Sequence, residues 1–388
     1  MIDLRNALTQ ELLLGRRVQH VLTAEDRRAF AGQRVMVTGA GGSVGSELAR
    51  QIAGCRPARL TLFEQSEYTL FRIEQELAED FPGVQLDPVL GDVRRRRSVR
   101  AAFDAAAPHV VYHAAAYKHV TMTERAVCPA VEANVLGAVN VARSAVDHDA
   151  RFVLISSDKA AQARSVMGAT KRLAELAVLS FESPAFRPVV VRFGNILGSS
   201  GSVVEVMIAR AMRGRPLLVT HPDATRYFMT AQEAVALVMK ADLMGRGGET
   251  YWLDMGAPVN LMTLVQRLQS LLERSGGRAP SVKVIGLRPG EKLHEELTTH
   301  GLELCQTSHK RIWSARQPEC DAEAIRRVLR ALRDDVDRND AMSALSDLCA
   351  GVPEFEPSPE AWRAAAAATG EMSEIRTYPS VVASPRVA

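Results

Sequence analysis

The sequence predicts an α/β fold with a doubly wound parallel sheet and a smaller α/β cap that binds a substrate. Six short apolar runs recur between residues 34 and 193, and helical stretches separate them, which is the pattern of successive βαβ units. The runs are apolar almost throughout, as is typical of parallel strands buried on both faces of a sheet. After Arg192 this alternation loosens into loops and amphipathic helices, which predicts a separate cap beside the sheet.

The elements follow in order along the chain. Residues 1–33 are expected to form an N-terminal arm with one short helix, because Leu8, Leu12 and Leu13 recur at helical spacing. Strands are predicted at 34–38, 58–63, 84–93, 108–116, 151–157 and 187–193. Helices are predicted at 66–80, 205–215, 233–243 and 261–275, and 285–297 is predicted as a loop that runs into a helix.

These elements predict four parts of the chain. The arm precedes a nucleotide-binding domain over 34–193, to which 230–256 is expected to return. The cap is expected to comprise 194–229 and 257–357. Residues 358–388 are Ala-rich and then rich in Ser, Pro and Val, which predicts a partly disordered C-terminal tail.

Composition excludes several classes of protein. The 388 residues are 47% hydrophobic and 24% charged, with a formal net charge of +3, which argues against a disordered chain and against a nucleic-acid binder. The four consecutive arginines at 94–97 are therefore expected on a solvated face. The five cysteines are scattered without a CxxC pair, which favours a reducing cytoplasm and neither disulfides nor a metal site. No apolar run is long enough to span a membrane.

A glycine-rich turn between the first predicted strand and its helix predicts a dinucleotide site. Gly39, Gly42 and Gly45 are spaced three apart, and glycine permits both positive φ and close approach of the backbone to a phosphate. The helix that begins around Ser43 and Val44 offers free N–H groups to a pyrophosphate. We therefore expect a Rossmann-like NAD-binding domain.

Glu64 favours NAD over NADP. It lies 19 residues after Gly45, at the end of the second strand, where an acid hydrogen-bonds the adenosine ribose. A carboxylate about 4 Å from a 2′-phosphate costs about 4 kcal/mol per charge pair at an effective dielectric constant of about 20. Asp92 and Val93 are expected at the adenine, with a plain strand-end turn as the alternative. Ala114 and Ala115 complete the predicted cofactor site.

The fifth predicted strand ends in a candidate reaction centre. Ser157, Asp158 and Lys159 follow it directly, and Met167 and Lys171 lie at i and i+4, on one helical face. A thioether has no titratable proton, so Asp158 and Lys159 are the candidates for proton transfer. The alternatives are a surface ion pair for Asp158 and Lys159, packing for Met167 and a solvated helix position for Lys171.

An ordered series of motifs narrows the interpretation. It comprises AAYKHV (115–120), SSDKA (156–160), VMGATKRLAEL (166–176), RFGNILGSSGSV (192–203), THPDATRYFMT (220–230), LDMG (253–256) and LRPGEKLHEEL (287–297). The series resembles the UDP-N-acetylglucosamine 4,6-dehydratases of the extended short-chain dehydrogenase/reductase superfamily. The closer resemblance is to the polysaccharide-biosynthesis branch, in which methionine replaces the catalytic tyrosine. It covers roughly residues 8–357. Many members of this branch carry preceding transmembrane helices, so we expect a soluble relative or an excised domain.

The resemblance implies a reaction on a UDP-N-acetylhexosamine in three steps. NAD takes hydride from C4, water leaves across C5 and C6, and the hydride returns to C6. We hypothesise that Asp158 carries the protons at C4 and C6, that Lys159 is the C5 base, and that these two roles could be exchanged. Ser157 would hydrogen-bond the C4 oxygen and Lys171 would hold the nicotinamide ribose. A UDP-sugar 4-epimerase and a non-catalytic NAD-binding protein are the alternatives.

The resemblance also implies how the UDP-sugar is held. A planar guanidinium suits two phosphate oxygens at once, so Arg226 and Arg288 are expected at the pyrophosphate. Lys118 is expected at the sugar, Asn195 at the substrate phosphate and Glu291 at the uridine ribose. The alternatives are a surface position for Lys118, a structural cap for Asn195 and a structural salt bridge for each arginine. Family members pair through helices of the nucleotide-binding domain, so a homo-oligomer is expected.

Overall fold

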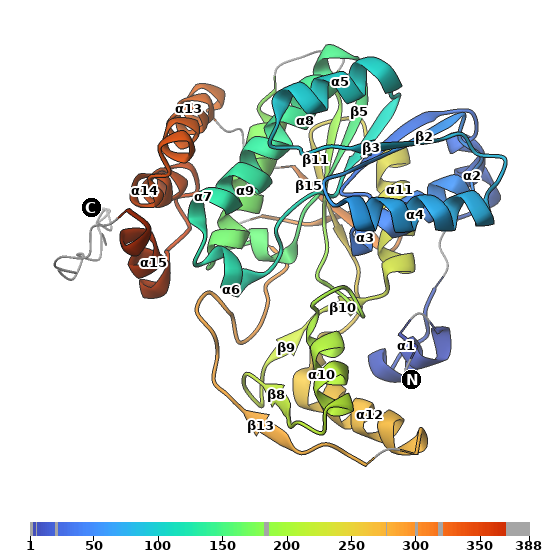
Figure 1. Cartoon of the computed structure of the whole chain (residues 1–388), viewed down its shortest axis with the longest axis vertical. Coiled ribbons are helices and arrows are strands. Elements are labelled where there is room, and N and C mark those ends of the chain that lie inside the picture. Colours follow the sequence, from blue (N-terminus) through green and yellow to red (C-terminus); the bar gives the residue numbers. More distant parts are fainter. Residues whose placement is uncertain are drawn as a thin grey trace.

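The centre of the molecule is a mostly parallel sheet. The computed structural model describes residues 3–4, 6–19, 22–181, 186–276, 278–298, 302–316 and 321–369. Within these residues the main sheet has nine strands in the order β14-β15-β11-β6-β5-β4-β1-β2-β3 (Figure 1). The strands from β11 to β3 are all parallel, and β15 and β14 extend the β11 edge in antiparallel orientation. The predicted α/β fold class is confirmed.

All six predicted strands are present, and the ends of each strand lie within a few residues of the predicted ends. The strands of the main sheet are β1 (Arg34–Thr38), β2 (Arg59–Glu64), β3 (Leu86–Leu90), β4 (Val110–His113), β5 (Arg151–Ile155), β6 (Pro188–Arg192), β11 (Glu249–Leu253), β14 (Cys305–Gln306) and β15 (Ile312–Arg316). β11 pairs with β6, so the chain comes back to the sheet after leaving it at Arg192.

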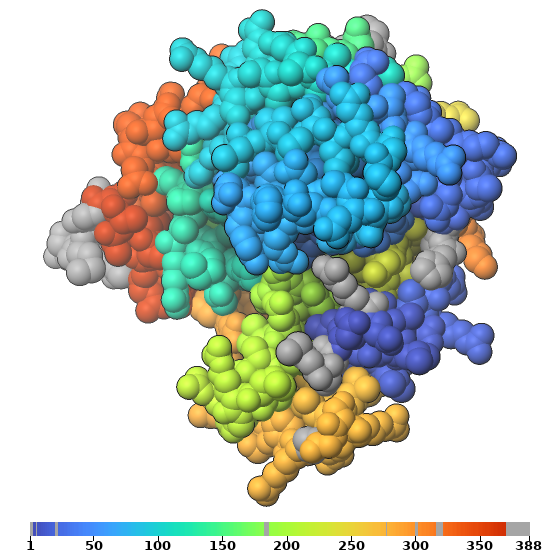
Figure 2. All heavy atoms as spheres, turned by 45° about the vertical axis from the view of Figure 1, so that its right-hand side comes forward, coloured from blue at the N-terminus to red at the C-terminus, as the bar shows by residue number. Residues whose placement is uncertain are grey.

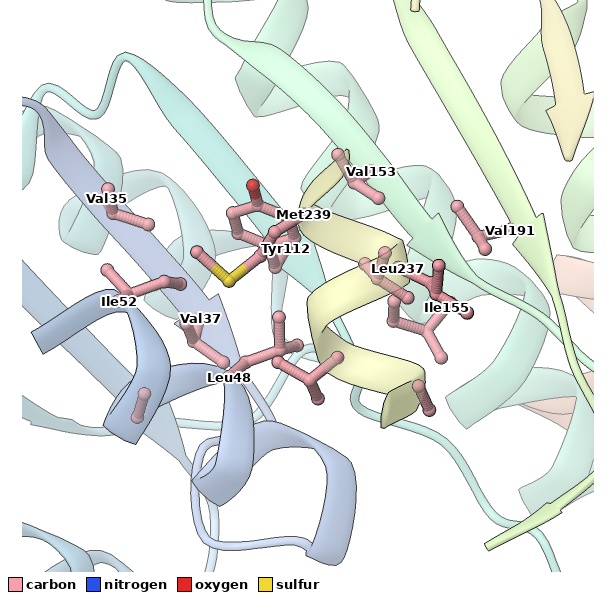
Figure 3. Packing of buried hydrophobic residues seen from close by; sticks show 14 of the residues in the cluster. Val35, Val37, Leu48, Ile52, Tyr112, Val153, Ile155, Val191, Leu237 and Met239 are labelled. Atoms are coloured by element: carbon pink, nitrogen blue, oxygen red, sulfur yellow. The ribbon is translucent and has the colours of Figure 1, made fainter. Parts of the chain in front are cut away.

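Helices cover both faces of this sheet because its side chains alternate between the faces. One face carries α2 (Ala24–Phe30), α3 (Ser43–Ala53), α4 (Glu67–Asp80) and α11 (Ala231–Met244). The other carries α5 (Arg96–Ala106), α8 (Gly137–Asp147) and α9 (Val166–Leu179). Figure 3 shows the first face, where Val35 and Val37 of β1 pack with Leu48 of α3 and Leu237 of α11. Met36, between the two valines, faces the other core.

The cap has its own apolar core. Its elements are β7 (Asn195–Ile196), α10 (Val203–Met212), β8 (Leu217–Val219), β9 (Thr225–Arg226), β10 (Phe228–Met229), β12 (Val259–Asn260), α12 (Leu261–Arg274) and β13 (Val282–Val284). α1 (Ala7–Leu14) of the N-terminal arm joins this core through Leu13 and Leu14. In Figure 2 the arm, in dark blue, lies against the orange segment that contains α12. α2, by contrast, packs with α11 on the nucleotide-binding domain.

The segment 285–297 is extended, so the helix predicted within it is wrong. Pro289 cannot donate a backbone hydrogen bond, and Gly290 after it has a φ of +73°. Apart from a turn in which Glu291 N donates to Arg288 O (3.0 Å), the backbone of the segment bonds to cap strands: Thr225 N of β9 donates to Leu293 O (3.1 Å), and His294 forms a bridge with Thr225. We call residues 285–297 the strap.

The C-terminal region packs on the nucleotide-binding domain, although the sequence predicts a cap that extends to residue 357 and a tail from residue 358. α13 (Ala322–Arg338), α14 (Ala341–Gly351) and α15 (Pro359–Thr369) lie beside α9 and the short helices α6 (Val120–Thr123), α7 (Val127–Val131) and η1 (Glu132–Leu136), as Figure 1 shows. Leu332 and Leu345 share an apolar cluster with Leu173 of α9. The burial of these side chains holds α13 and α14 against the nucleotide-binding domain. Residues 370–388 of the predicted tail lie outside the described residues. Among the described helices, none is both long and apolar enough to cross a bilayer.

Replacing Leu345 tests whether the C-terminal helices are part of the main core. The Leu345→Ala variant is expected to lower the free energy of unfolding by about 2–5 kcal/mol, because it leaves a cavity in a fully buried cluster. Leu8→Ala is the control, since Leu8 is 70% exposed and its replacement is expected to change stability by less than about 0.5 kcal/mol. Urea unfolding followed by circular dichroism measures both. Equal, small effects would show that the helices do not stabilise the domain.

Candidate active site

Almost all the residues singled out in the sequence line one cavity of about 1000 Å³. They are Gly39, Gly42, Ser43, Val44, Gly45, Glu64, Asp92, Val93, Ala114, Ala115, Lys118, Ser157, Lys159, Met167, Lys171, Asn195, Arg226, Arg288 and Glu291. The exception is Asp158, which is 1% exposed and lies behind the lining. The cavity lies at the carboxyl ends of the parallel strands, where open α/β sheets bind their ligands.

The glycine turn after β1 is shaped for close approach of a ligand. Gly39 has a φ of +68°, and a Cβ atom there would lie 2.7 Å from the backbone nitrogen of Ala115. A Cβ atom on Gly45 would lie 2.0 Å from the carbonyl oxygen of Gly39. No side chain caps the N-terminus of α3, which begins at Ser43. The turn therefore presents bare backbone and a helix N-terminus to the cavity, an arrangement that binds phosphate groups.

Glu64 is fixed by backbone donors. Its Oε2 atom accepts a hydrogen bond from Gly41 N (3.0 Å), and its Oε1 atom accepts from Gln65 N (2.9 Å) and Ser66 N (3.0 Å). The carboxylate thus ties the end of β2 to the glycine turn. Because Oε2 accepts only one of these bonds, it retains a lone pair toward the cavity.

Asp92 is engaged by a neighbour. Arg94 donates to both of its carboxylate oxygens at 2.6–3.0 Å and also reaches Glu132 (3.3 Å). Burial alone would raise the pKa of Asp92, but the Arg94 guanidinium holds it below its usual value. In this structure the Asp92 carboxylate is therefore paired with Arg94. Val93 is buried and packs in the apolar core between the sheet and α5 and α8.

β5 is followed by Ser157 and a short 3₁₀ helix, η2 (Asp158–Ala160), for which Ser157 is the N-cap. We call residues 157–160 the reaction turn. Ser157 Oγ donates to Asp158 Oδ1 (3.1 Å) and accepts from Lys159 N (3.2 Å), and Lys159 Nζ donates to the same Oδ1 (2.9 Å). Asp158 Oδ2 is buried with no hydrogen-bond partner in the described part of the chain. A Cβ atom on Gly194 would lie 2.8 Å from it. Asp158 thus reaches the cavity through Ser157 and Lys159.

A buried ion network supports this turn from behind, and the sequence analysis missed it. Glu175 of α9 accepts hydrogen bonds from Ser156 Oγ, from Arg192 Nε (2.7 Å) and from Arg172 Nη1 (3.2 Å). Burial raises the pKa of Glu175, but Arg192, Arg172 and Ser156 together more than offset this effect and lower the pKa overall. The network holds the end of β5 against α9, which carries two of the candidate residues.

Met167 and Lys171 enter the site from the first turns of α9. Ser165 caps this helix by accepting from Gly168 N (3.1 Å). Lys171 Nζ donates to Ile155 O (2.5 Å). Burial lowers the pKa of Lys171 to about 8, although Glu175 favours the ammonium. Met167 is buried beside the cavity and brings no proton donor or acceptor to it.

Glu295 of the strap is a second residue that the sequence analysis missed. Its Oε1 atom lies 3.4 Å from Lys159 Nζ and 3.6 Å from Arg226 Nε. Burial would lower the pKa of Lys159, but Asp158 and Glu295 raise it above its usual value. The motif LRPGEKLHEEL (287–297) contains two adjacent glutamates, Glu295 and Glu296. The predicted helix did not indicate which of these two side chains faces the site.

The cations expected at the pyrophosphate differ in their environments. Arg226 Nη1 donates to Thr225 O (2.7 Å) and Leu293 O (3.0 Å), and its Nη2 donates to Glu291 Oε1 (2.7 Å), so this side chain fastens the strap. In the described part of the chain, neither the Arg288 guanidinium nor the Lys118 ammonium has a hydrogen-bond or ion-pair partner. These two cations face the cavity unpaired.

The side-chain amide of Asn195 has a backbone partner. Asn195 Nδ2 donates to Tyr227 O (3.1 Å), which joins β7 to the residue between β9 and β10. Across the described ranges, no group of three His, Cys, Asp or Glu side chains could hold a metal ion.

Comparison with known proteins identifies the family. The family model described as "Polysaccharide biosynthesis protein" matches residues 35–317. The capsular polysaccharide biosynthesis protein CapD of Staphylococcus aureus is 41% identical over 293 residues, which are 74% of this chain and 48% of CapD. The chain therefore spans about half the length of that relative. A UDP-glucose 4-epimerase of Rickettsia canadensis is 31% identical over 279 residues, covering 70% of this chain and 79% of the epimerase.

A solved structure supports the fold. The dTDP-glucose 4,6-dehydratase DesIV from Streptomyces venezuelae, a double mutant with NAD bound, superposes with a TM-score of 0.58 at 20% identity, covering 68% of this chain and 88% of DesIV. The family match over residues 35–317 and the 41% identity to CapD show that the chain belongs to the polysaccharide biosynthesis protein family.

Proposed function

We propose that the protein dehydrates a UDP-N-acetylhexosamine, with UDP-N-acetylglucosamine as the substrate to test first, to the 4-keto-6-deoxy sugar. The observation that carries the proposal is the Ser157–Asp158–Lys159 turn. It brings an ammonium and a hydroxyl to the wall of a cavity that also holds the glycine turn, with a carboxylate bonded directly behind them. An oxidation at C4 alone needs one proton acceptor, whereas elimination across C5 and C6 needs an acid and a base.

NAD is the proposed cofactor, and the residues present fit it. The glycine turn leaves no room for side chains at Gly39 and Gly45, and the α3 N-terminus suits a pyrophosphate. Glu64 Oε2 is the acceptor proposed for a ribose hydroxyl. DesIV, which shares the fold, holds NAD. When bound, NAD supplies the acceptor and the donor of the hydride.

The protons are handled by the chain's own side chains. In the proposed sequence the C4 hydroxyl proton passes to Asp158 through Ser157 Oγ. Asp158 then gives this proton, by the same route, to the C6 hydroxyl, which leaves as water. Lys159 removes the C5 proton and later returns it. Lys171, an ammonium below a pH of about 8, stabilises negative charge that develops on the C4 oxygen.

The unpaired cations are the proposed contacts to the diphosphate. Arg288 and Lys118 face the cavity without partners in the described residues, whereas three of the five N–H donors of Arg226 are already taken. We therefore assign the diphosphate to Arg288 and Lys118, and to Arg226 the role of holding the strap. Glu291 and Asn195 stay predictions at the uridine ribose and phosphate, as do a cytoplasmic location and self-association.

A UDP-sugar 4-epimerase is the second candidate, because the Rickettsia canadensis relative carries that name. An epimerase would reduce the C4 ketone from the opposite face and would need no acid–base pair at C5 and C6. The products separate the two functions: a dehydratase releases a 4-keto-6-deoxy sugar, and an epimerase releases the galacto isomer.

Asp158→Asn tests the proposed chemistry. The wild-type chain, incubated with UDP-N-acetylglucosamine and NAD, is expected to release a 4-keto-6-deoxy product. The variant is expected to lose about 10²–10⁴-fold in turnover, because an amide cannot accept and return the proton. NAD binding by calorimetry is expected to stay unchanged. Asp223→Asn is the control, since Asp223 is exposed and outside the cavity lining. Near-normal turnover of Asp158→Asn would reject the assignment.

Glu64→Gln tests the cofactor. The wild-type chain is expected to bind NAD at least about tenfold more tightly than NADP, because the carboxylate repels a 2′-phosphate. The amide keeps an acceptor but removes the charge, so the ratio of the two dissociation constants is expected to fall by at least about tenfold. Glu67→Gln, at an exposed position on α4, is the matched control. A wild-type chain without a preference would contradict the role of Glu64.

A further inference from the structure

Lys159 lies in a row of alternating charges that joins the sheet to the cap. Its ammonium is 2.9 Å from Asp158 Oδ1 and 3.4 Å from Glu295 Oε1. The same Glu295 oxygen is 3.6 Å from Arg226 Nε, and Arg226 Nη2 is 2.7 Å from Glu291. The side chains of Lys159 and Glu295 are 19% and 4% exposed, so water screens this row only weakly.

This arrangement conflicts with the role that the proposed function gives to Lys159. Two carboxylates stabilise the ammonium, and an ammonium has no lone pair with which to accept the C5 proton. Lys159 must therefore first give up a proton. The acceptors that face it in the described residues are Asp158 and Glu295, while Arg226 is the nearest cation. Asp158 is committed to the C4 proton, so Glu295 is the acceptor that is left.

We propose that Glu295 accepts a proton from Lys159 and so converts it into the C5 base, a role that rests on the proposed dehydration. The proton leaves Nζ for Oε1 and gives a neutral amine beside a neutral carboxylic acid. The amine takes the C5 proton and gives it back to C5 after the hydride has returned to C6. Glu295 then returns its proton to Lys159, and every group regains its starting charge.

Contacts of the strap with the cap and with the reaction turn determine where Glu295 lies. The position of the proposed proton acceptor therefore depends on the cap. Arg226 holds the strap at Leu293 O and Glu291, and Lys292 Nζ donates to Ala161 O, directly after the reaction turn (3.3 Å). Glu296, the next residue, pairs with Lys292 at 3.6 Å and is 47% exposed. It has the same chemistry as Glu295 and does not contact Lys159, which makes it the matched control.

The first readout is the protonation of Lys159, which tests whether the Glu295 carboxylate acts on it. A salt bridge that merely fastens the cap would use the same contacts, and the pH profile of turnover separates that role from proton transfer. The full chains of wild type, Glu295→Gln and Glu296→Gln are acetylated with acetic anhydride over a range of pH, and the labelling of Lys159 is followed by mass spectrometry. Loss of a carboxylate at this distance is expected to move the labelling midpoint at least about one pH unit toward acid in Glu295→Gln. No shift is expected in Glu296→Gln.

The pH profile of turnover supplies the second readout. Wild-type kcat is expected to be flat around neutral pH, because the proton moves within the pair. In Glu295→Gln, kcat is expected to fall at least about 100-fold at pH 7 and to recover as the pH approaches the labelling midpoint of Lys159. Glu295→Asp, which keeps the carboxylate, is expected to retain the high midpoint, and it serves in place of the glutamine variant should that variant fail to fold.

The outcomes are separable. An unmoved midpoint in Glu295→Gln, or a kcat profile parallel to that of the wild type, overturns the role of Glu295. A wild-type chain that turns over no UDP-N-acetylglucosamine contradicts the proposed function instead. In that case a moved midpoint still supports proton coupling between Glu295 and Lys159, and an unmoved one rejects it.

Discussion

The ammonium of Lys159 lies between carboxylates from two distant parts of the chain, and the rest of the site is arranged around it. Asp158 comes from the turn after β5 and Glu295 from the strap, which crosses from the cap. Two unit charges about 4 Å apart attract by about 4 kcal/mol at an effective dielectric constant of about 20, and burial opposes much of this gain. The net stability gained from the Lys159 pairs is therefore small, and in the proposed mechanism their role is to exchange protons.

The sheet brings the parts of the site together. Parallel strands buried on both faces end at one edge, so the glycine turn of β1, the Glu64 carboxylate of β2 and the reaction turn of β5 meet there. The Glu175 network fixes the end of β5 from behind. Methionine at position 167 adds no proton donor or acceptor, so the proposed mechanism assigns the proton transfers to Asp158, Lys159 and the groups that touch them.

The fold and half of the site were readable from local sequence, and the remainder depends on tertiary contacts. Glycine spacing and apolar runs are local, so the six strands and the residues of the glycine turn could be predicted. The strap could not, because its backbone forms only a turn within itself and otherwise bonds to cap strands that are distant in the sequence. Nor could the burial of Asp158 behind Ser157, the pairing of Asp92 with Arg94 or the docking of α13–α15, since each depends on a partner that the sequence does not name.

The central claim is that the protons move between C5 and a lysine while the hydride moves from C4 to C6. Turnover of UDP-N-acetylglucosamine in deuterated water, with the product examined by NMR, tests this most directly. The account predicts deuterium at C5, because the hydrogens on the lysine nitrogen exchange with solvent before one of them returns to C5. It predicts none at C6, because the hydrogen at C6 comes from C4. A product that keeps its C6 hydroxyl, is inverted at C4 and carries no deuterium at C5 would contradict it.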